Sequence, residues 1–151
     1  MEWLTDEQQQ IWRDYLAMSS RLHTAMHRQL QADCDLSLSD YDVLVALSER
    51  GPTRINELGE HLGWEQSRLS HQLRRMRGRG MVEREGDHDD RRGATVAITD
   101  AGTAALEAAA PGHVELVRSV VFDGLPPDQL GALGGALRAA LRRLERRRAD
   151  H

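Results

Sequence analysis

The residues best suited to bind another molecule lie between Gln66 and Gly78. In this segment Leu69, Leu73 and Met76 recur at helical spacing and form one apolar stripe. The opposite face carries hydroxyls, an imidazole and guanidinium groups, with no acidic residue between Gln66 and Met81. Guanidinium groups suit phosphates and guanine edges, and short hydroxyls suit phosphates and base edges. The candidate nucleic-acid-binding residues are Gln66, Ser67, Arg68, Ser70, His71, Arg74, Arg75 and Arg77.

The flanking segments predict how this helix is held. A short helix over residues 56–62 stops at Gly63, and the second helix runs over about 65–79 before a C-cap glycine, Gly80. Residues 81–84 and 94–98 suit two strands, with Val96 and Ile98 on one face, and the polar loop 85–93 suits a hairpin tip. Helix, turn, helix and hairpin in this order predict a winged helix-turn-helix. The alternative is a solvated basic helix beside an exposed turn.

Several motifs resemble the MarR family of bacterial transcription regulators. They are the run 67–76 (SRLSHQLRRM), Gly80-Met-Val, the wing run 89–93 (DDRRG) and the run 98–102 (ITDAG). The family's Asp-x-Arg wing signature falls on Asp90 and Arg92, and its Leu-Thr-x-x-Gly signature ends at Gly102. The resemblance implies that Arg92 reaches the minor groove, with Asp90 orienting it and Arg91 beside it. The alternative for the wing is a loop ion pair without DNA contact, and Arg91 is equally suited to face solvent.

The charge distribution agrees with a local binding face. The 151-residue chain has a net charge of −4, yet residues 66–84 hold six Arg and one acidic residue. The overall acidity argues against non-specific polyanion binding. With one cysteine, no intrachain disulfide can form, and no signal or membrane-spanning pattern is found. We therefore expect a cytoplasmic protein that joins the bacterial nucleoid when it binds DNA.

The remaining segments predict a mostly α fold, α+β only through the small wing sheet. A capping box of Thr5 and Gln8 opens a helix to about residue 33, and Ser39 with Asp42 restarts the chain as a second helix. Thr99 caps a helix that Pro111 should kink or split, and a last helix covers about 128–148. The resemblance adds a short strand at 54–55. We expect a single MarR-like domain over 1–151, with a DNA-binding lobe at 36–99 and a helical dimerisation lobe at 1–35 and 100–151.

Apolar stripes on the first and last helices have no other segment to cover them. The resemblance implies that these helices of two protomers interlock, so that a homodimer presents two recognition helices to a palindromic operator. The candidate dimerisation residues are Ile11, Met18, Leu130, Leu133, Leu137, Leu141 and Leu144. The arginine-rich end of the last helix is interpreted as a solvated face, with a second DNA-contacting patch as the alternative.

The resemblance also implies an effector, typically an anionic aromatic or phenolic compound that releases a repressor from DNA. Candidate ligand-binding residues are Trp12, Tyr15, Arg21 and Tyr41. Ordinary core packing of these rings is the alternative, and it corresponds to a DNA-binding regulator without an effector.

Two sensor chemistries remain as lesser alternatives. Cys34 lies between Asp33 and Asp35, whose charges should raise the thiol pKa and oppose redox sensing. His23 and His27 share a helical face at a spacing that can chelate zinc, but no nearby Glu or Cys completes a site. The sequence shows no nucleophile–base motif, phosphate loop or carboxylate pair, so we expect no enzyme activity, no cofactor and no metal centre.

Overall fold

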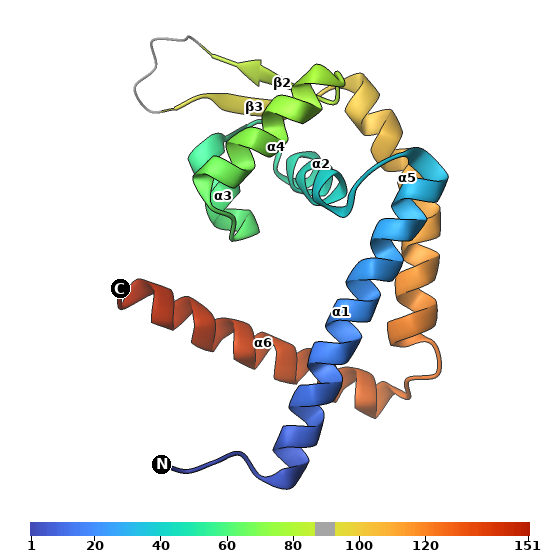
Figure 1. Cartoon of the computed structure of the whole chain (residues 1–151), viewed down its shortest axis with the longest axis vertical. Coiled ribbons are helices and arrows are strands. Elements are labelled where there is room, and N and C mark those ends of the chain that lie inside the picture. Colours follow the sequence, from blue (N-terminus) through green and yellow to red (C-terminus); the bar gives the residue numbers. More distant parts are fainter. Residues whose placement is uncertain (87–92) are drawn as a thin grey trace. The chain divides into compact units, whose positions relative to one another are not determined.

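The computed structural model describes residues 1–86 and 93–151 and contains the predicted succession of helices and strands (Figure 1). Residues 1–113 form one compact unit and residues 114–151 a second. The elements are α1 (Asp6–Cys34), α2 (Leu38–Arg50), β1 (Thr53–Arg54), α3 (Ile55–Leu62), α4 (Gln66–Gly78), β2 (Val82–Glu85), β3 (Thr95–Ile98), α5 (Asp100–Val117), the π-helical segment η1 (Arg118–Phe122) and α6 (Pro127–Ala149).

The first two helices both begin with capping boxes. Thr5 Oγ1 accepts the Gln8 N–H while the Gln8 side chain accepts the Thr5 N–H, which confirms the predicted start of α1. The predicted start of α2 at Ser39 is wrong. Ser37 is the N-cap, because its hydroxyl accepts the Asp40 N–H at 3.0 Å and the Asp40 carboxylate accepts the Ser37 N–H at 2.9 Å. Serine–x–x–acid occurs twice in this stretch, and only the first copy is used.

The core of the first unit is built around α2. Val43, Leu44 and Leu47 on this helix are at most 1% exposed, and α2 contacts α1, α3, α4 and the sheet. Burial on several sides explains why its sequence lacks a clean polar stripe. The other core side chains include Leu30, Leu36, Leu58, Leu69, Leu73, Met76, Val82 and Val96.

The three strands form an antiparallel sheet of order β1-β3-β2. In the hairpin Val82 pairs with Ile98 and Glu85 pairs with Thr95, so the register confirms the two wing strands. The third strand is shifted by one residue from its predicted place. It contains Thr53 and Arg54, because Ile55 already begins α3.

The start of α5 is held against the residues that directly follow α4. Thr99 Oγ1 accepts the Gly102 N–H at 3.0 Å and donates to the Gly80 carbonyl oxygen, which confirms Thr99 as a cap. A Cβ at Gly102 would lie 2.1 Å from the Met81 carbonyl oxygen, so only glycine fits there. The chain therefore closes tightly around the base of the hairpin.

Of the kink or split predicted at Pro111, the split is wrong. The helix continues through Pro111 to Val117 and changes to π-helical geometry only at Arg118. Pro111 lacks the N–H that one backbone hydrogen bond of the helix would need. The helix nevertheless stays packed against α1 at this point. Gly112 lies directly beside Gln29 and Asp33 of α1, where a Cβ would lie 2.5 Å from an Asp33 oxygen.

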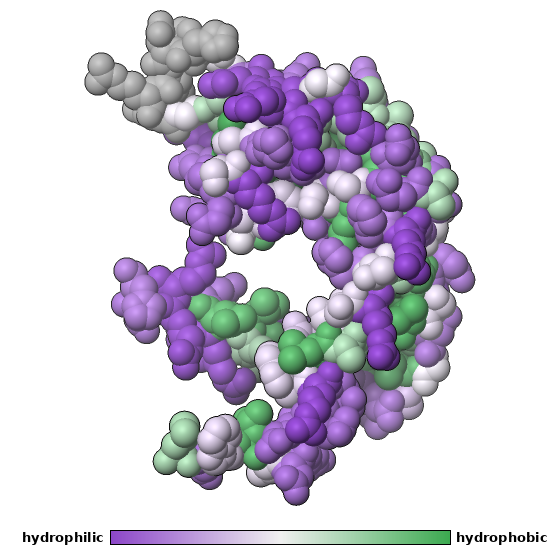
Figure 2. Space-filling model, viewed as in Figure 1, coloured by the Kyte–Doolittle hydropathy of each residue, from purple (hydrophilic) through white to green (hydrophobic). Residues whose placement is uncertain are grey.

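The second unit contains the end of α5, η1 and α6. Pro127 occupies the first turn of α6, as predicted. Four leucines of the predicted stripe are about half exposed: Leu130, Leu137, Leu141 and Leu144. Leu133 is partly buried. Hydrophobic residues are visible along α6 in Figure 2. Among the described residues, no helix is long and apolar enough to cross a membrane.

Candidate nucleic-acid interface

The helix α4 is held by an apolar stripe and a defined end. Leu69, Leu73 and Met76 are at most 2% exposed, which confirms the predicted packing face. After the helix, the Gly80 N–H donates to the Arg77 carbonyl and the Met81 N–H to the Met76 carbonyl. Gly80 has a φ of +73°, so these bonds form a Schellman motif that requires a left-handed residue. The helix end is thus anchored to the start of the wing.

The opposite face of α4 is open to solvent, as the sequence predicted. Figure 2 shows mainly hydrophilic residues over the part of the chain that carries this helix. Within α4, no acidic side chain interrupts the face, and its cations are all arginines. The exposed residues are Gln66, Ser67, Arg68, Ser70, His71, Arg74, Arg75 and Arg77.

Arg68 is supported by an aromatic ring. Its guanidinium carbon lies 4.2 Å from the centre of the Trp64 ring, in the turn between α3 and α4. Trp64 itself packs against the core, and its backbone N–H donates to the Gly59 carbonyl. A cation above an indole face is held electrostatically and sterically. Arg68 is therefore directed outward from a fixed platform.

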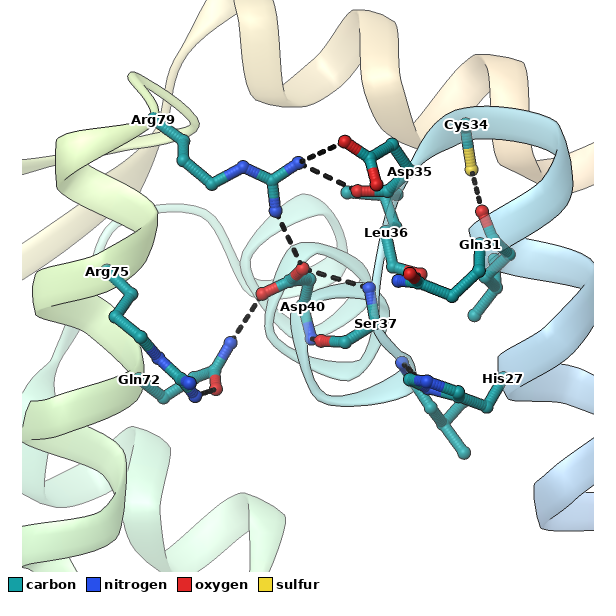
Figure 3. A network of polar contacts seen from close by, with 12 residues as sticks. His27, Gln31, Cys34, Asp35, Leu36, Ser37, Asp40, Gln72, Arg75 and Arg79 are labelled. Atoms are coloured by element: carbon teal, nitrogen blue, oxygen red, sulfur yellow. Dashed lines mark hydrogen bonds and ion pairs between the residues drawn. The ribbon is translucent and has the colours of Figure 1, made fainter.

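Arg75 is held by a hydrogen-bonded chain that begins in α2 (Figure 3). Its Nη2 donates to Gln72 Oε1 at 2.7 Å, and Gln72 Nε2 donates to Asp40 Oδ1 at 2.5 Å. Gln72 is 4% exposed and Asp40 is 6% exposed. An exposed residue of the candidate interface is thus connected to a carboxylate in the protein interior.

Arg79 joins the other oxygen of the same carboxylate. Its Nη1 donates to Asp40 Oδ2 at 3.1 Å, and its Nη2 donates to the Asp35 backbone carbonyl at 2.7 Å. These contacts fasten the end of α4 to the α1–α2 turn (Figure 3). No motif in the sequence pointed to Asp40, Gln72 or Arg79 as site residues. The available signal was Gln72 itself, a polar residue next to Leu73 on the otherwise apolar face of α4.

A second cluster of cations lies where α4 meets the wing sheet. Arg74 and Arg77 of α4 line a hollow of about 230 Å³ together with Arg84 of β2. Ser70 contributes a hydroxyl to the same hollow, and Ile55 and Val96 form part of its wall. Converging guanidinium groups suit the phosphates of a nucleic acid backbone. Arg84 was missed as a site residue because it was assigned only to a strand.

Comparisons with known proteins identify the family. The family model described as MarR family matches residues 36–93. Sco3205 of Streptomyces coelicolor, a MarR family transcriptional regulator whose crystal structure is in complex with DNA, is 39% identical to this chain with a TM-score of 0.86. The match covers 93% of this chain and 89% of Sco3205. The chain belongs to the MarR family.

Two further relatives are a repressor and a regulator whose DNA binding responds to a small molecule. The chain is 32% identical over 89 residues to the transcriptional repressor NicR of Pseudomonas putida, a match that spans 59% of this chain and 56% of NicR. It is 25% identical, with a TM-score of 0.75, to BpsR of Bordetella bronchiseptica, whose DNA binding is regulated by 6-hydroxynicotinic acid. That match covers 87% of this chain and 98% of BpsR. This MarR-family protein is a DNA-binding transcriptional regulator, and its family does not consist of enzymes.

The wing residues of this regulator can be placed only in part. Asp90, Arg91 and Arg92 lie outside the described residues, so their assigned roles stay predictions. The strands that lead to them are described, and Glu83, Arg84 and Glu85 of β2 are exposed. The paired strands extend away from the core next to α4 (Figure 1).

The ligand-binding candidates of the regulator do not form one cluster within a chain. Trp12 and Tyr15 stack at 5.3 Å between ring centres and are about half exposed, and Arg21 on the same helix is exposed. Tyr41 is 8% exposed and packs on His113, next to the region where α5 lies beside Gln29. Tyr15 and Gln29 are separated by about 21 Å of helix, at ~1.5 Å per residue. Tyr41 therefore belongs to the core of the first unit.

Cys34 and His27, the residues considered for redox and metal sensing, each form a hydrogen bond with the backbone. The Cys34 thiol donates to the Leu30 carbonyl oxygen, and burial raises its pKa, with further increases from Asp33 and Asp35. A raised thiol pKa disfavours the reactive thiolate. His27 Nδ1 accepts the Leu38 N–H at 3.3 Å. Among residues 1–86 and 93–151, no three His, Cys, Asp or Glu side chains, those of His23 and His27 included, lie close enough together to hold a metal ion.

Asp42 and His113 in the first unit influence each other's pKa. Burial raises the pKa of Asp42, while the charges of His23, His113 and Arg68 lower it. Burial lowers the pKa of His113, and the charge of Asp42 opposes that decrease. Both groups are therefore shifted toward their neutral forms, which low-dielectric surroundings favour.

Proposed function

We propose that this protein is a homodimeric repressor that binds a palindromic operator with α4 in the major groove. The observation that carries the proposal is the exposed, acid-free face of α4, with Arg68 and Arg75 held in defined positions. Guanidinium groups read guanine edges by paired hydrogen bonds. The arginines around the 230 Å³ hollow are placed to contact the backbone beside the wing. A two-fold dimer places two such helices about 34 Å apart, one turn of DNA.

The experiment is selection of bound duplexes from a random-sequence library, followed by titration of the selected duplex. The proposal predicts two similar half-sites about 10 base pairs apart and two chains bound per duplex. Binding must weaken steeply with salt because phosphate contacts release counterions. A single half-site bound by one chain contradicts the dimeric arrangement.

The exposed leucines of α6 are proposed as the main part of the dimer interface. Leu137 is 51% exposed and Leu141 is 57% exposed, although both are large apolar side chains. Ile11 and Met18 of α1 are also exposed, at 61% and 44%. The spacing of the α6 leucines is that of a heptad repeat, which is typical of helices that pack against another helix.

The dimer proposal is tested with Leu137→Asp in the full chain. A carboxylate buried in an apolar interface lacks a partner, so sedimentation should show monomers or aggregates. Ala132→Asp, an exposed position on the side of α6 away from the leucine stripe, is the control and should remain a dimer. A clean dimer for Leu137→Asp would place the interface elsewhere.

The wing is proposed to contact the minor groove through Arg92. This proposal is supported by the Asp-x-Arg motif, and by the paired strands that carry it next to α4. Arg92→Ala should weaken operator binding and leave the melting temperature nearly unchanged, and Arg91→Ala serves as the adjacent control. An Arg92→Ala protein that unfolds would show a structural role instead.

A small anionic aromatic compound is proposed as the effector. Two observations support this class of ligand: the exposed Trp12–Tyr15 stack, and the regulation of BpsR by 6-hydroxynicotinic acid. Trp12 also lines a largely apolar hollow of about 290 Å³ with Trp3, Leu4 and Arg13. Stacking on Trp12 and a guanidinium–carboxylate pair with Arg13 together suit an aromatic acid.

The effector proposal is tested by titrating the operator complex with 6-hydroxynicotinate, salicylate and urate. If the compound binds the DNA-free arrangement of the protein more favourably than the DNA-bound one by ~1–3 kcal/mol, operator affinity falls about 5–150-fold. Trp12→Ala should abolish the response and Trp12→Phe should keep part of it. Equal potency on Trp12→Ala would place the ligand elsewhere. The absence of any release or thermal shift would favour the second candidate function, a regulator without an effector.

A further inference from the structure

Arg75 differs from its neighbour Arg74 in how its guanidinium is held. Arg75 Nη2 donates to Gln72 Oε1 at 2.7 Å, one turn earlier on α4. Arg74 makes no side-chain hydrogen bond with the part of the chain that the structure describes. Both residues are exposed arginines on the same helix. The difference therefore comes from Gln72, which is buried beneath Arg75 and not beneath Arg74.

The orientation of the Gln72 amide is determined by Asp40. A carboxylate only accepts hydrogen bonds, so the amide must turn its NH₂ group toward Asp40 Oδ1. The amide oxygen then faces outward, where it can accept a hydrogen bond from a guanidinium. A buried carboxylate thus makes the outer end of Gln72 an acceptor.

Asp40 is itself fixed on its other side. Its Oδ2 accepts the Ser37 N–H at 2.9 Å and an Nη1 hydrogen of Arg79 at 3.1 Å. With both oxygens bonded and the side chain buried, the carboxylate has little freedom to rotate (Figure 3). The chain from Asp40 through Gln72 to Arg75 is therefore continuous and rigid at its inner end.

One hydrogen bond to Gln72 leaves most of the donors of Arg75 free. A guanidinium carries five N–H donors in a fixed plane, and Arg75 uses one of them within the described part of the chain. Fixing that plane before binding reduces the side-chain entropy lost when a base is contacted. It also limits the directions in which the remaining donors point, which favours one base edge over others.

We propose that Gln72 is a positioning residue that sets base specificity through Arg75 without touching DNA. This inference rests on the proposed function, since it requires that Arg75 reads a base in the operator. Gln72 would affect which base sequence the protein prefers. It would not affect the positive charge that attracts the phosphate backbone. A residue buried in the core of the lobe then determines part of the operator sequence.

The test uses the full-length protein and the duplex selected from a random library. Gln72→Met keeps the side-chain length and removes both hydrogen-bonding groups. Its affinity for duplexes with every single base substitution is compared with that of the wild type. We expect the preference at one position in each half-site to fall by about tenfold, the usual size of one base contact. Affinity for a random-sequence duplex should not change.

Combining Gln72→Met with a second substitution separates a positioning role of Gln72 from a general loss of stability. In the Arg75→Ala background, Gln72→Met should have no further effect on base preference, because its target is absent. An equal effect in both backgrounds would overturn the inference. In an Arg74→Ala background the effect of Gln72→Met should remain complete.

The outcomes also distinguish this inference from the proposed function. If the wild type selects no preferred duplex, the proposed function fails, and the inference with it. If the wild type selects an operator and Gln72→Met reads it with unchanged preferences, only the inference fails. If Gln72→Met does not fold, the side-chain NMR signals of the free wild type decide. Arg75 Nε–Hε should be more ordered than Arg74 Nε–Hε, and equal mobility would overturn the inference.

Discussion

The Arg79 guanidinium and the Asp40 carboxylate join the end of α4 to the start of α2 through a contact of 3.1 Å. Asp40 is buried, whereas the Arg79 side chain is 42% exposed. The same carboxylate caps α2 and accepts from Gln72. One acidic side chain therefore connects a helix start, the recognition helix and the segment before the wing.

Replacement of Asp40 should destabilise the protein strongly. Asp40→Ala removes half of a capping box and leaves the buried Gln72 amide without its acceptor. We expect a loss of about 2–4 kcal/mol in the free energy of unfolding. Chemical denaturation measures it, and Glu49→Ala, an exposed acid on the same helix, should change it by less than about 0.5 kcal/mol. Similar values for the two variants would show that the network contributes no stability.

Trp64 should influence DNA binding through Arg68. Trp64→Leu removes the aromatic face beneath the guanidinium and keeps an apolar side chain against the core. Operator affinity should fall by about 0.5–2 kcal/mol, the range of a cation–π contact. Trp64→Phe should lose less. A double-mutant cycle with Arg68→Ala measures the coupling, and strictly additive effects would refute it.

Gly102 should not tolerate a side chain. In Gly102→Ala the new Cβ would lie 2.1 Å from the Met81 carbonyl oxygen, so the backbone must move. We expect about 1–3 kcal/mol of destabilisation, as for other overpacked sites. Gly78→Ala is the control, because a Cβ there would have nothing within 4 Å. Thermal melting of the two variants should separate them clearly, and equal melting temperatures would contradict the tight closure.

Stability should decrease when the pH falls through the range in which His113 titrates. Burial lowers the His113 pKa below its ordinary value of 6.5, so the unfolded chain binds the proton more readily than the folded one. Stability therefore rises with pH up to about 6.5 and is lost below it. Burial raises the Asp42 pKa above 3.8, so the folded chain binds that proton more readily, and the Asp42 contribution has the opposite sign: it lowers stability as the pH rises through the Asp42 titration. His113→Phe should flatten the slope of unfolding free energy between pH 5 and 7, and His151→Gln should not.

Much of the recognition lobe was predictable because local patterns determine it. The apolar stripe of Leu69, Leu73 and Met76 fixes which face of α4 is buried, and the remaining side chains must then face outward. Gly80 likewise marks the end of the helix through its left-handed backbone. These features depend only on the spacing of residues within one segment, so they can be predicted from the sequence.

The polar network was not predictable because it depends on tertiary pairing. Asp40 and Gln72 are 32 residues apart, and the capping motif that contains Asp40 gives no indication of its pairing with Gln72. The choice of Ser37 over Ser39 as the cap of α2 has the same origin, since Asp40 is held from outside by Arg79. The continuity of α5 through Pro111 also reflects packing beside α1, which no local propensity reveals.

The most direct test of the proposed DNA interface is the effect of single α4 arginines on binding to the selected operator. Arg75→Ala and Arg68→Ala should each weaken operator binding by about 1–3 kcal/mol and relax the preference at particular base positions. Arg50→Ala, outside the recognition helix, is the control and should leave operator affinity unchanged. Fluorescence anisotropy at two salt concentrations measures both the affinity and its salt dependence. Unchanged operator affinity in both α4 variants would remove this face from the DNA interface and contradict the account.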